Sequence, residues 1–127
     1  MTENEIGKII VDCAYHIHKD LGPGLLESVY EIVLAKSLEK RGLHVERQVA
    51  IPFVYDGIRF EEGFRADIVV EKKVIIELKS VEKINEVYYK QLLTYLRLAD
   101  MKLGFLLNFG DKLMKNGIER VANHLEE

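Results

Sequence analysis

Two short apolar strands with charged residues on one side constrain this fold more than any other stretch. The segment from Phe64 to Ser80 reads FRADIVVEKKVIIELKS and alternates with the two-residue period of β-structure around a polar turn at 71–73. One face of this predicted hairpin holds only aliphatic residues, namely Ile68, Val70, Val74, Ile76 and Leu78. The other face holds Arg65, Asp67, Val69, Ile75, Glu77 and Lys79.

The alternation also fixes the register of the hairpin. With the turn at 71–73, Asp67 lies directly opposite Glu77. A slip of one residue would move Asp67 among the aliphatic side chains, so the pattern favours this pairing. Two carboxylates and the Lys79 ammonium then converge on one face. That arrangement is costly for folding and useful for binding a metal ion.

The spacing of these charges predicts a site for a hard divalent cation. Mg²⁺ takes oxygen ligands from one or two carboxylates and keeps several waters. Asp67 and Glu77 can supply two oxygens, and the backbone carbonyl of Leu78 can supply a third. Lys79 would lie beside a metal-bound water, where it can orient that water, lower its pKa or stabilise a phosphorane. Such a site would hydrolyse phosphodiesters. The alternative is a solvent-facing cluster of charges that contributes little to stability.

Two polar residues on flanking helices can extend this site. Glu27 lies in the first turn of one predicted helix and could complete the acidic cluster, and Gln91 lies in another and could orient the water or the phosphate. Each also has a structural interpretation. Glu27 can be a favourable anion at a helix N-terminus, and Gln91 a polar neighbour of a core stripe.

The remaining periodicities predict an α/β fold with a mixed sheet of about four strands. A capping box at Thr2 and Glu5 begins the first helix, and the apolar run at 101–109 indicates a strand covered on both faces, parallel to 74–79. Helices are expected over 3–20, 24–41 and 83–100, and strands over 43–55, 58–70, 74–79 and 101–109. Residues 110–127 read as a loop and a short, weakly specified element.

A second hairpin is predicted at Asp56-Gly57, a strong two-residue turn signal. Its pairing places Phe60 opposite Phe53, Phe64 opposite Val49 and Asp67 opposite Glu46, with a bulge at Glu62-Gly63. This register keeps the apolar residues of both strands on one face and puts Glu46 and Gln48 on the same face as Asp67. Arg47 breaks the alternation, and we interpret it as an inward charge with a partner.

Composition narrows the class of protein. The net charge of -3 counts against non-specific, charge-driven binding of duplex nucleic acid, but it does not exclude a metal-dependent enzyme. No apolar run approaches the about 18 residues that span a bilayer. The single Cys13 excludes an internal disulfide and fits a reducing compartment. We therefore expect a soluble cytoplasmic protein.

Several motifs together resemble one protein family. Residues 24–30, GLLESVY, match the signature of the GxxExxY proteins. The resemblance continues in order through VERQV at 45–49, RAD at 65–67, IELK at 76–79, QLLTYL at 91–96 and LLNF at 106–109. It covers nearly the whole chain. That family is placed in the PD-(D/E)-x-K nuclease superfamily, and Ala66 stands where the superfamily name has proline.

The resemblance implies a restriction-endonuclease-like αβββαβ core and a site that depends on Mg²⁺, with Mn²⁺ as a substitute. The implied site residues are Glu27, Asp67, Glu77, Lys79 and Gln91. We expect residues 1–127 to form one nuclease-like domain that acts on DNA or RNA, and a homodimer is compatible because one small site cuts one strand. Two alternatives stay open: a module that binds nucleic acid or a partner but hydrolyses little, and a purely structural interaction protein.

Overall fold

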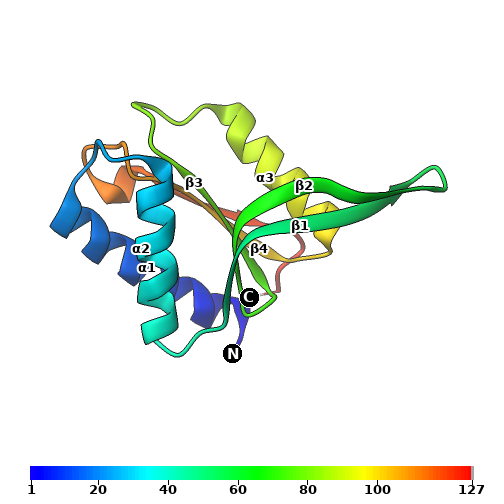
Figure 1. Ribbon diagram of the computed structural model, residues 1–127, viewed down its shortest axis with the longest axis horizontal. Coiled ribbons are helices and arrows are strands. Elements are labelled where there is room, and N and C mark those ends of the chain that lie inside the picture. The colour runs from blue at the N-terminus through cyan, green and yellow to red at the C-terminus, as the bar shows by residue number, and fades with distance from the viewer. Residues whose placement is uncertain (127) are drawn as a thin grey trace.

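A mixed five-stranded sheet lies between helices in the computed structural model, which describes residues 1–126 (Figure 1). The helices are α1 (Glu3–Leu21), α2 (Glu27–Lys40) and α3 (Glu86–Ala99), with a 3₁₀ turn, η1, at Met114–Asn116. The strands are β1 (Val45–Tyr55), β2 (Ile58–Val70), β3 (Val74–Lys79), β4 (Leu103–Asn108) and β5 (Ile118–Ala122), in spatial order β1-β2-β3-β4-β5. Only β3 and β4 are parallel neighbours. The α/β prediction is confirmed.

The predicted start of α1 is confirmed by its hydrogen bonds. The Glu5 amide donates to the Thr2 hydroxyl (3.2 Å), and the Glu5 carboxylate accepts from the Thr2 amide (2.9 Å). α2 begins three residues later than predicted, because Leu26 is still extended. Glu27 is therefore the first helical residue of α2.

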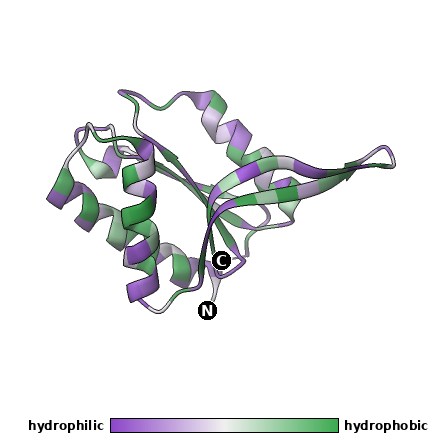
Figure 2. Ribbon diagram, in the orientation of Figure 1, coloured by the Kyte–Doolittle hydropathy of each residue, from purple (hydrophilic) through white to green (hydrophobic). Residues whose placement is uncertain are grey.

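Two apolar layers cover the two faces of the sheet. α1 and α2 pack on the predicted aliphatic face, which is formed by Ile68, Val70, Val74, Ile76 and Leu78. α3 covers the opposite face with Leu92 and Leu96, which pack against Val69, Ile75 and Leu106. Figure 2 shows how hydrophobic the middle strands are. Burying each large aliphatic side chain contributes roughly 1.5–3 kcal/mol, so the register of β2 and β3 is well fixed.

The sheet has one more strand than expected. β5 pairs antiparallel with β4 at the edge, where we predicted a loop and a short element. Val121 is the only buried residue of β5, so the strand has little apolar alternation from which it could be recognised. The prediction for 101–109 is confirmed, because all six residues of β4 are buried between the helical layers.

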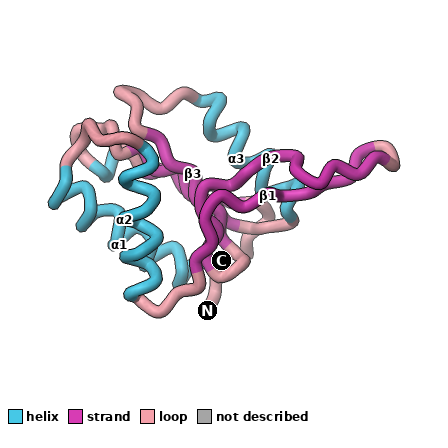
Figure 3. Tube along the Cα trace, in the orientation of Figure 1, coloured by secondary structure: helices cyan, strands magenta, loops and turns pink. Residues whose placement is uncertain are grey.

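The hairpin of β1 and β2 extends past the helices as a long arm (Figure 3). Its turn has positive φ at Asp56 and Gly57, as the Asp-Gly signal predicts, and Phe53 pairs with Phe60. Beyond that pair, three residues of β2 lie opposite Pro52 alone, which confirms a bulge at Glu62-Gly63. A β-carbon at Gly63 would collide with the ring of Phe53.

This bulge overturns part of the predicted register. Phe64 lies opposite Ile51 rather than Val49, and Glu46 lies opposite Val69 rather than Asp67. The physical reason is that two extra residues shift the register without changing the face, so alternation alone does not detect them.

The apolar residues of this hairpin also do not stay on one face, as we had predicted. Phe64 and Ala66 pack beneath α3, whereas Ile68 packs beneath α1 and α2. Residues two apart in a regular strand share a face, so β2 turns over at Asp67. No helix in the described part of the chain is long and apolar enough to cross a membrane.

Candidate active site

Asp67 and Glu77 lie where β2 and β3 separate. Backbone pairing ends at Ile68 and Ile76. Beyond that point the Asp67 amide donates to Oε2 of Glu77 (3.3 Å), and the Leu78 amide donates to Oδ2 of Asp67 (2.9 Å). The two carboxyl groups take the place of the missing ladder bonds. The structure thus brings together the two residues that strand alternation placed opposite each other.

Glu77 is held in a strongly perturbed environment. It is 9% exposed. Burial, together with the hydrogen bond and the negative charge of Asp67, raises the pKa of Glu77 to about 9, while Lys79 opposes the shift. Glu77 therefore keeps its proton at neutral pH. A cation bound here would have to displace that proton.

The donor atoms fit a Mg²⁺ or Mn²⁺ ion that keeps part of its water shell. The Lys79 carbonyl accepts from the Phe109 amide (2.9 Å) on the β4 side. Successive residues of a strand face opposite neighbours, so the carbonyl of Leu78 faces the side of Asp67, as its amide does. Among residues 1–126, no three or more His, Cys, Asp or Glu side chains group to hold a metal. Two carboxylates and a carbonyl suit an ion of this kind.

Lys79 ends β3 on the same face as Glu77. Its Nζ lies 4.4 Å from the centroid of the Tyr88 ring, at the start of α3. A cation at this distance is attracted by the face of the ring. The ring therefore restrains the ammonium beside the carboxyl pair. The alternation of the strands alone does not indicate this contact between Tyr88 and Lys79.

α3 presents one side to the site. The carboxyl groups of Glu77 and Asp67 add to burial in raising the pKa of Tyr95, which stacks on Phe64 at 3.9 Å. Gln91 lies three residues after Tyr88 and four before Tyr95, so all three share one side of the helix. Gln91 is exposed, and its side chain forms no hydrogen bond to another described residue. It is at the margin of the site.

Glu27 also lies at the margin, at the N-terminus of α2. The loop before it is bound to the end of β3, because the Ser80 hydroxyl donates to the Leu25 carbonyl (2.7 Å). Glu27 lines a shallow pocket together with Ser80, which is the residue that follows Lys79. The Tyr30 hydroxyl fixes this loop by donating to the Gly22 carbonyl (2.6 Å). Glu27 is exposed and forms no three-carboxylate cluster with Asp67 and Glu77.

Asn108 fixes the chain that follows Lys79, and our sequence prediction missed this role. Asn108 is fully buried at the end of β4. Its amide oxygen accepts from the Val81 amide (3.0 Å), and its nitrogen donates to the Val81 carbonyl (2.9 Å) and to Asp111 (2.8 Å). The sequence signal for this role was the position of Asn108, a polar residue at the end of an apolar run.

A half-buried ion pair joins α2 to β1. Glu31 of α2 is 6% exposed and accepts from Arg47 (Nη2, 2.9 Å) and from the Gln48 amide (2.7 Å). The prediction of a partner for Arg47 is confirmed. The side chain of Gln48, which we predicted on the face of Asp67, instead turns to Glu31, and Glu46 contacts His44 (3.3 Å). The positive φ of Gln48 accompanies this turn of its side chain.

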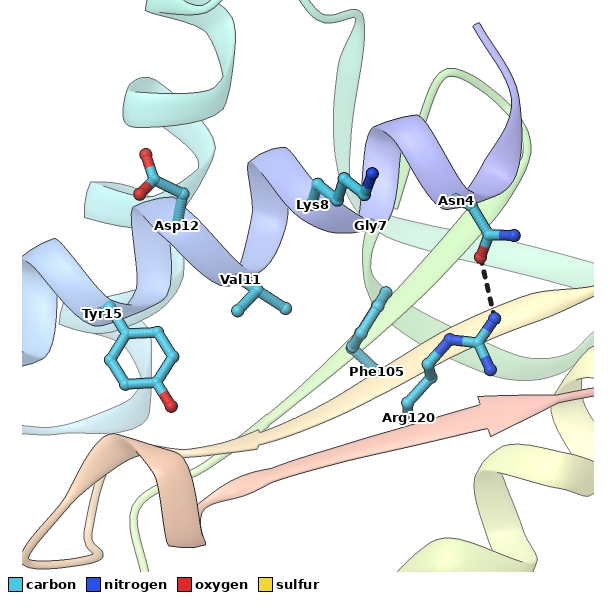
Figure 4. A pocket seen from close by; sticks show the side chains of 8 residues that line it. All are labelled: Asn4, Gly7, Lys8, Val11, Asp12, Tyr15, Phe105 and Arg120. Atoms are coloured by element: carbon cyan, nitrogen blue, oxygen red, sulfur yellow. Dashed lines mark hydrogen bonds between the residues drawn. The ribbon is translucent and has the colours of Figure 1, made fainter.

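Another groove lies away from these residues. It runs between α1 and the edge of β5 and has a volume of about 490 Å³ (Figure 4). Phe105 and Val11 form part of its apolar lining, and Arg120 bonds to Asn4 (2.8 Å) at one end. It contains none of the predicted site residues, so its size does not indicate chemistry.

Comparison with known proteins identifies the family. The family model described as the PD-(D/E)XK nuclease superfamily matches residues 4–121, which is most of the chain. Neither the curated proteins nor the solved structures gave a match.

Proposed function

The chain belongs to the PD-(D/E)XK nuclease superfamily, and on this basis we propose that it is a Mg²⁺-dependent nuclease that hydrolyses phosphodiesters of DNA or RNA. Mn²⁺ would substitute. One observation supports this most strongly: the paired carboxyl groups of Asp67 and Glu77, with Lys79 two residues further along the same face. The ordered motifs also favour membership of the GxxExxY family.

Each residue has a distinct role in this proposal. Asp67 and Glu77 would hold the metal, which when bound would supply Lewis-acid stabilisation and an activated water. Lys79 orients that water or neutralises charge on the phosphorane, from the position beside the Tyr88 ring. Gln91 orients the water or the phosphate from α3. Glu27 assists from the N-terminus of α2.

A second function is a binding module that keeps the nuclease fold but hydrolyses little. The net charge of -3 favours the partner-binding form of this module, because any protein that acts on nucleic acid must approach a polyanion. Both functions share the metal site, and they differ in what Lys79 does.

The remaining parts of the proposal concern organisation. We assign residues 1–127 to one nuclease-like domain in the cytoplasm, where the buried thiol of Cys13 stays reduced. A homodimer would let two sites cut two strands.

A nuclease screen tests the function directly. Single-stranded, double-stranded and structured DNA and RNA are incubated with Mg²⁺ or Mn²⁺, with Lys79→Ala as the matched variant. Cleavage that the wild type performs and Lys79→Ala loses, with calorimetric metal affinity unchanged, supports the enzyme. Metal and nucleic-acid binding without cleavage supports the module. No metal binding by the wild type contradicts both.

A further inference from the structure

One residue of β1 has a backbone conformation that its side-chain type disfavours. Gln48 has φ = 51°, in the left-handed region. Its neighbours pair normally, Arg47 with Ile68 and Val49 with Ala66. Continuity of this register puts Gln48 opposite Asp67. The irregular residue therefore faces the candidate metal ligand across the hairpin.

A single buried carboxylate holds this conformation. The Gln48 side-chain amide donates to Oε1 of Glu31 (2.7 Å). The preceding Arg47 donates to Oε2 of the same residue, from Nε (3.0 Å) and from Nη2 (2.9 Å). α2 thus fixes two successive residues of β1, one on each oxygen of Glu31.

The two strands change faces together at this point. Arg47 binds α2 on one face of the sheet, whereas Val49 packs in the layer beneath α3. On β2, Ile68 and Ala66 divide between the same two layers. The half-turn is centred on Gln48 and Asp67. It leaves the Asp67 carboxylate in the gap beside β3, where it accepts from the Leu78 amide.

We propose that Gln48, held by Glu31, is a positioning residue that aims the Asp67 carboxylate at Glu77. Its left-handed backbone makes the hairpin turn over at Asp67, and the Glu31 network couples that turn to α2. The consequence for catalysis rests on the proposed function. The aim of Asp67 is a property of the metal-free protein and can be measured without activity.

The test compares two substitutions that both remove the amide bonded to Glu31. Gln48→Gly accepts a positive φ, whereas Gln48→Val strongly disfavours it. Hydrogen exchange of the Leu78 amide, followed by NMR without metal, reports whether Asp67 still accepts from it. The Phe109 amide, bonded to the Lys79 carbonyl, reports whether the β3–β4 ladder is intact. Mn²⁺ affinity is measured by calorimetry on the same samples.

We expect Leu78 exchange to rise about tenfold or more in Gln48→Val and to stay near the wild-type rate in Gln48→Gly, with Phe109 unchanged in both. Mn²⁺ affinity should fall about tenfold in the valine variant only. Equal Leu78 rates in the two variants would overturn the proposal. If the valine variant does not fold, Gln48→Ala replaces it with the same direction of effect. A wild type that binds no Mn²⁺ contradicts the proposed function, and Leu78 exchange still decides this inference.

Discussion

The backbone amide of Asp67 donates to the carboxyl group of Glu77 at 3.3 Å, across the point where their two strands separate. The Asp67 carboxylate in turn accepts from the Leu78 amide at 2.9 Å. These bonds hold the two carboxyl groups side by side without a metal. The arrangement has a cost at neutral pH, because the buried Glu77 must keep a proton beside the partly exposed Asp67. The pH dependence of the unfolding free energy and the release of a proton on metal binding should both report this protonation.

The first prediction concerns stability against pH. The folded-state pKa of Glu77 is raised to about 9 from 4.5, so its contribution to stability is fully present below pH 4.5 and is lost as pH rises through 9. Without metal, the free energy of unfolding should fall by up to about 1.4 kcal/mol per pH unit inside this window. Glu77→Gln cannot ionise and should flatten the decline. Urea unfolding at pH 6 to 9 in EDTA measures it, and parallel curves for both proteins would contradict the assignment.

The second prediction concerns the proton that a metal displaces. Titration with Mn²⁺ at pH 7 should release about one proton per ion, because Glu77 must ionise to bind. Calorimetry in two buffers of different ionisation enthalpy measures this release directly. Affinity should rise with pH up to about 9. Asp67→Asn should weaken binding strongly, and Glu62→Gln, an exposed carboxylate on the same strand, is the control. Binding without proton release would exclude a protonated Glu77.

Sequence alone predicted that Asp67 and Glu77 lie together in the candidate site, but not the residues that support them. Alternation placed Asp67, Glu77 and Lys79 on one face, because aliphatic residues fill the other face of the same strands. It failed beyond the bulge at Gly63, since two extra residues leave the face unchanged. The orientation of the Gln48 side chain was not predicted, because a glutamine in a sequence does not indicate a positive φ. This conformation accompanies the hydrogen bond of Gln48 to Glu31, seventeen residues earlier in the chain. Tertiary contacts decided these positions.

The third prediction concerns the ring beside Lys79. Tyr88→Leu removes the aromatic face and keeps an apolar side chain, whereas Tyr88→Phe keeps the ring and removes only the hydroxyl. A cation–π contact is worth about 0.5–2 kcal/mol, so metal-dependent cleavage should fall roughly two- to thirtyfold in the leucine variant. The phenylalanine variant should retain most of its rate, and Mn²⁺ affinity should be unchanged in both. Equal loss in both variants would assign the effect to the hydroxyl instead.

The fourth prediction compares the stability contribution of the half-buried Arg47–Glu31 pair with that of an exposed ion pair. Arg47→Ala leaves the Glu31 carboxylate, 8% exposed at its side chain, without its cation. Removing one partner of a fully buried pair costs about 3–5 kcal/mol, and since the Arg47 side chain is 43% exposed we expect roughly 2–4 kcal/mol of lost unfolding free energy. Arg65→Ala breaks the exposed pair with Glu62 and should cost less than about 1 kcal/mol. Urea unfolding compares the two variants with the wild type. Similar small losses in both variants would mean that water already screens the Glu31 carboxylate. A larger loss for Arg47→Ala would show that this ion pair stabilises the contact between α2 and the strand that faces Asp67.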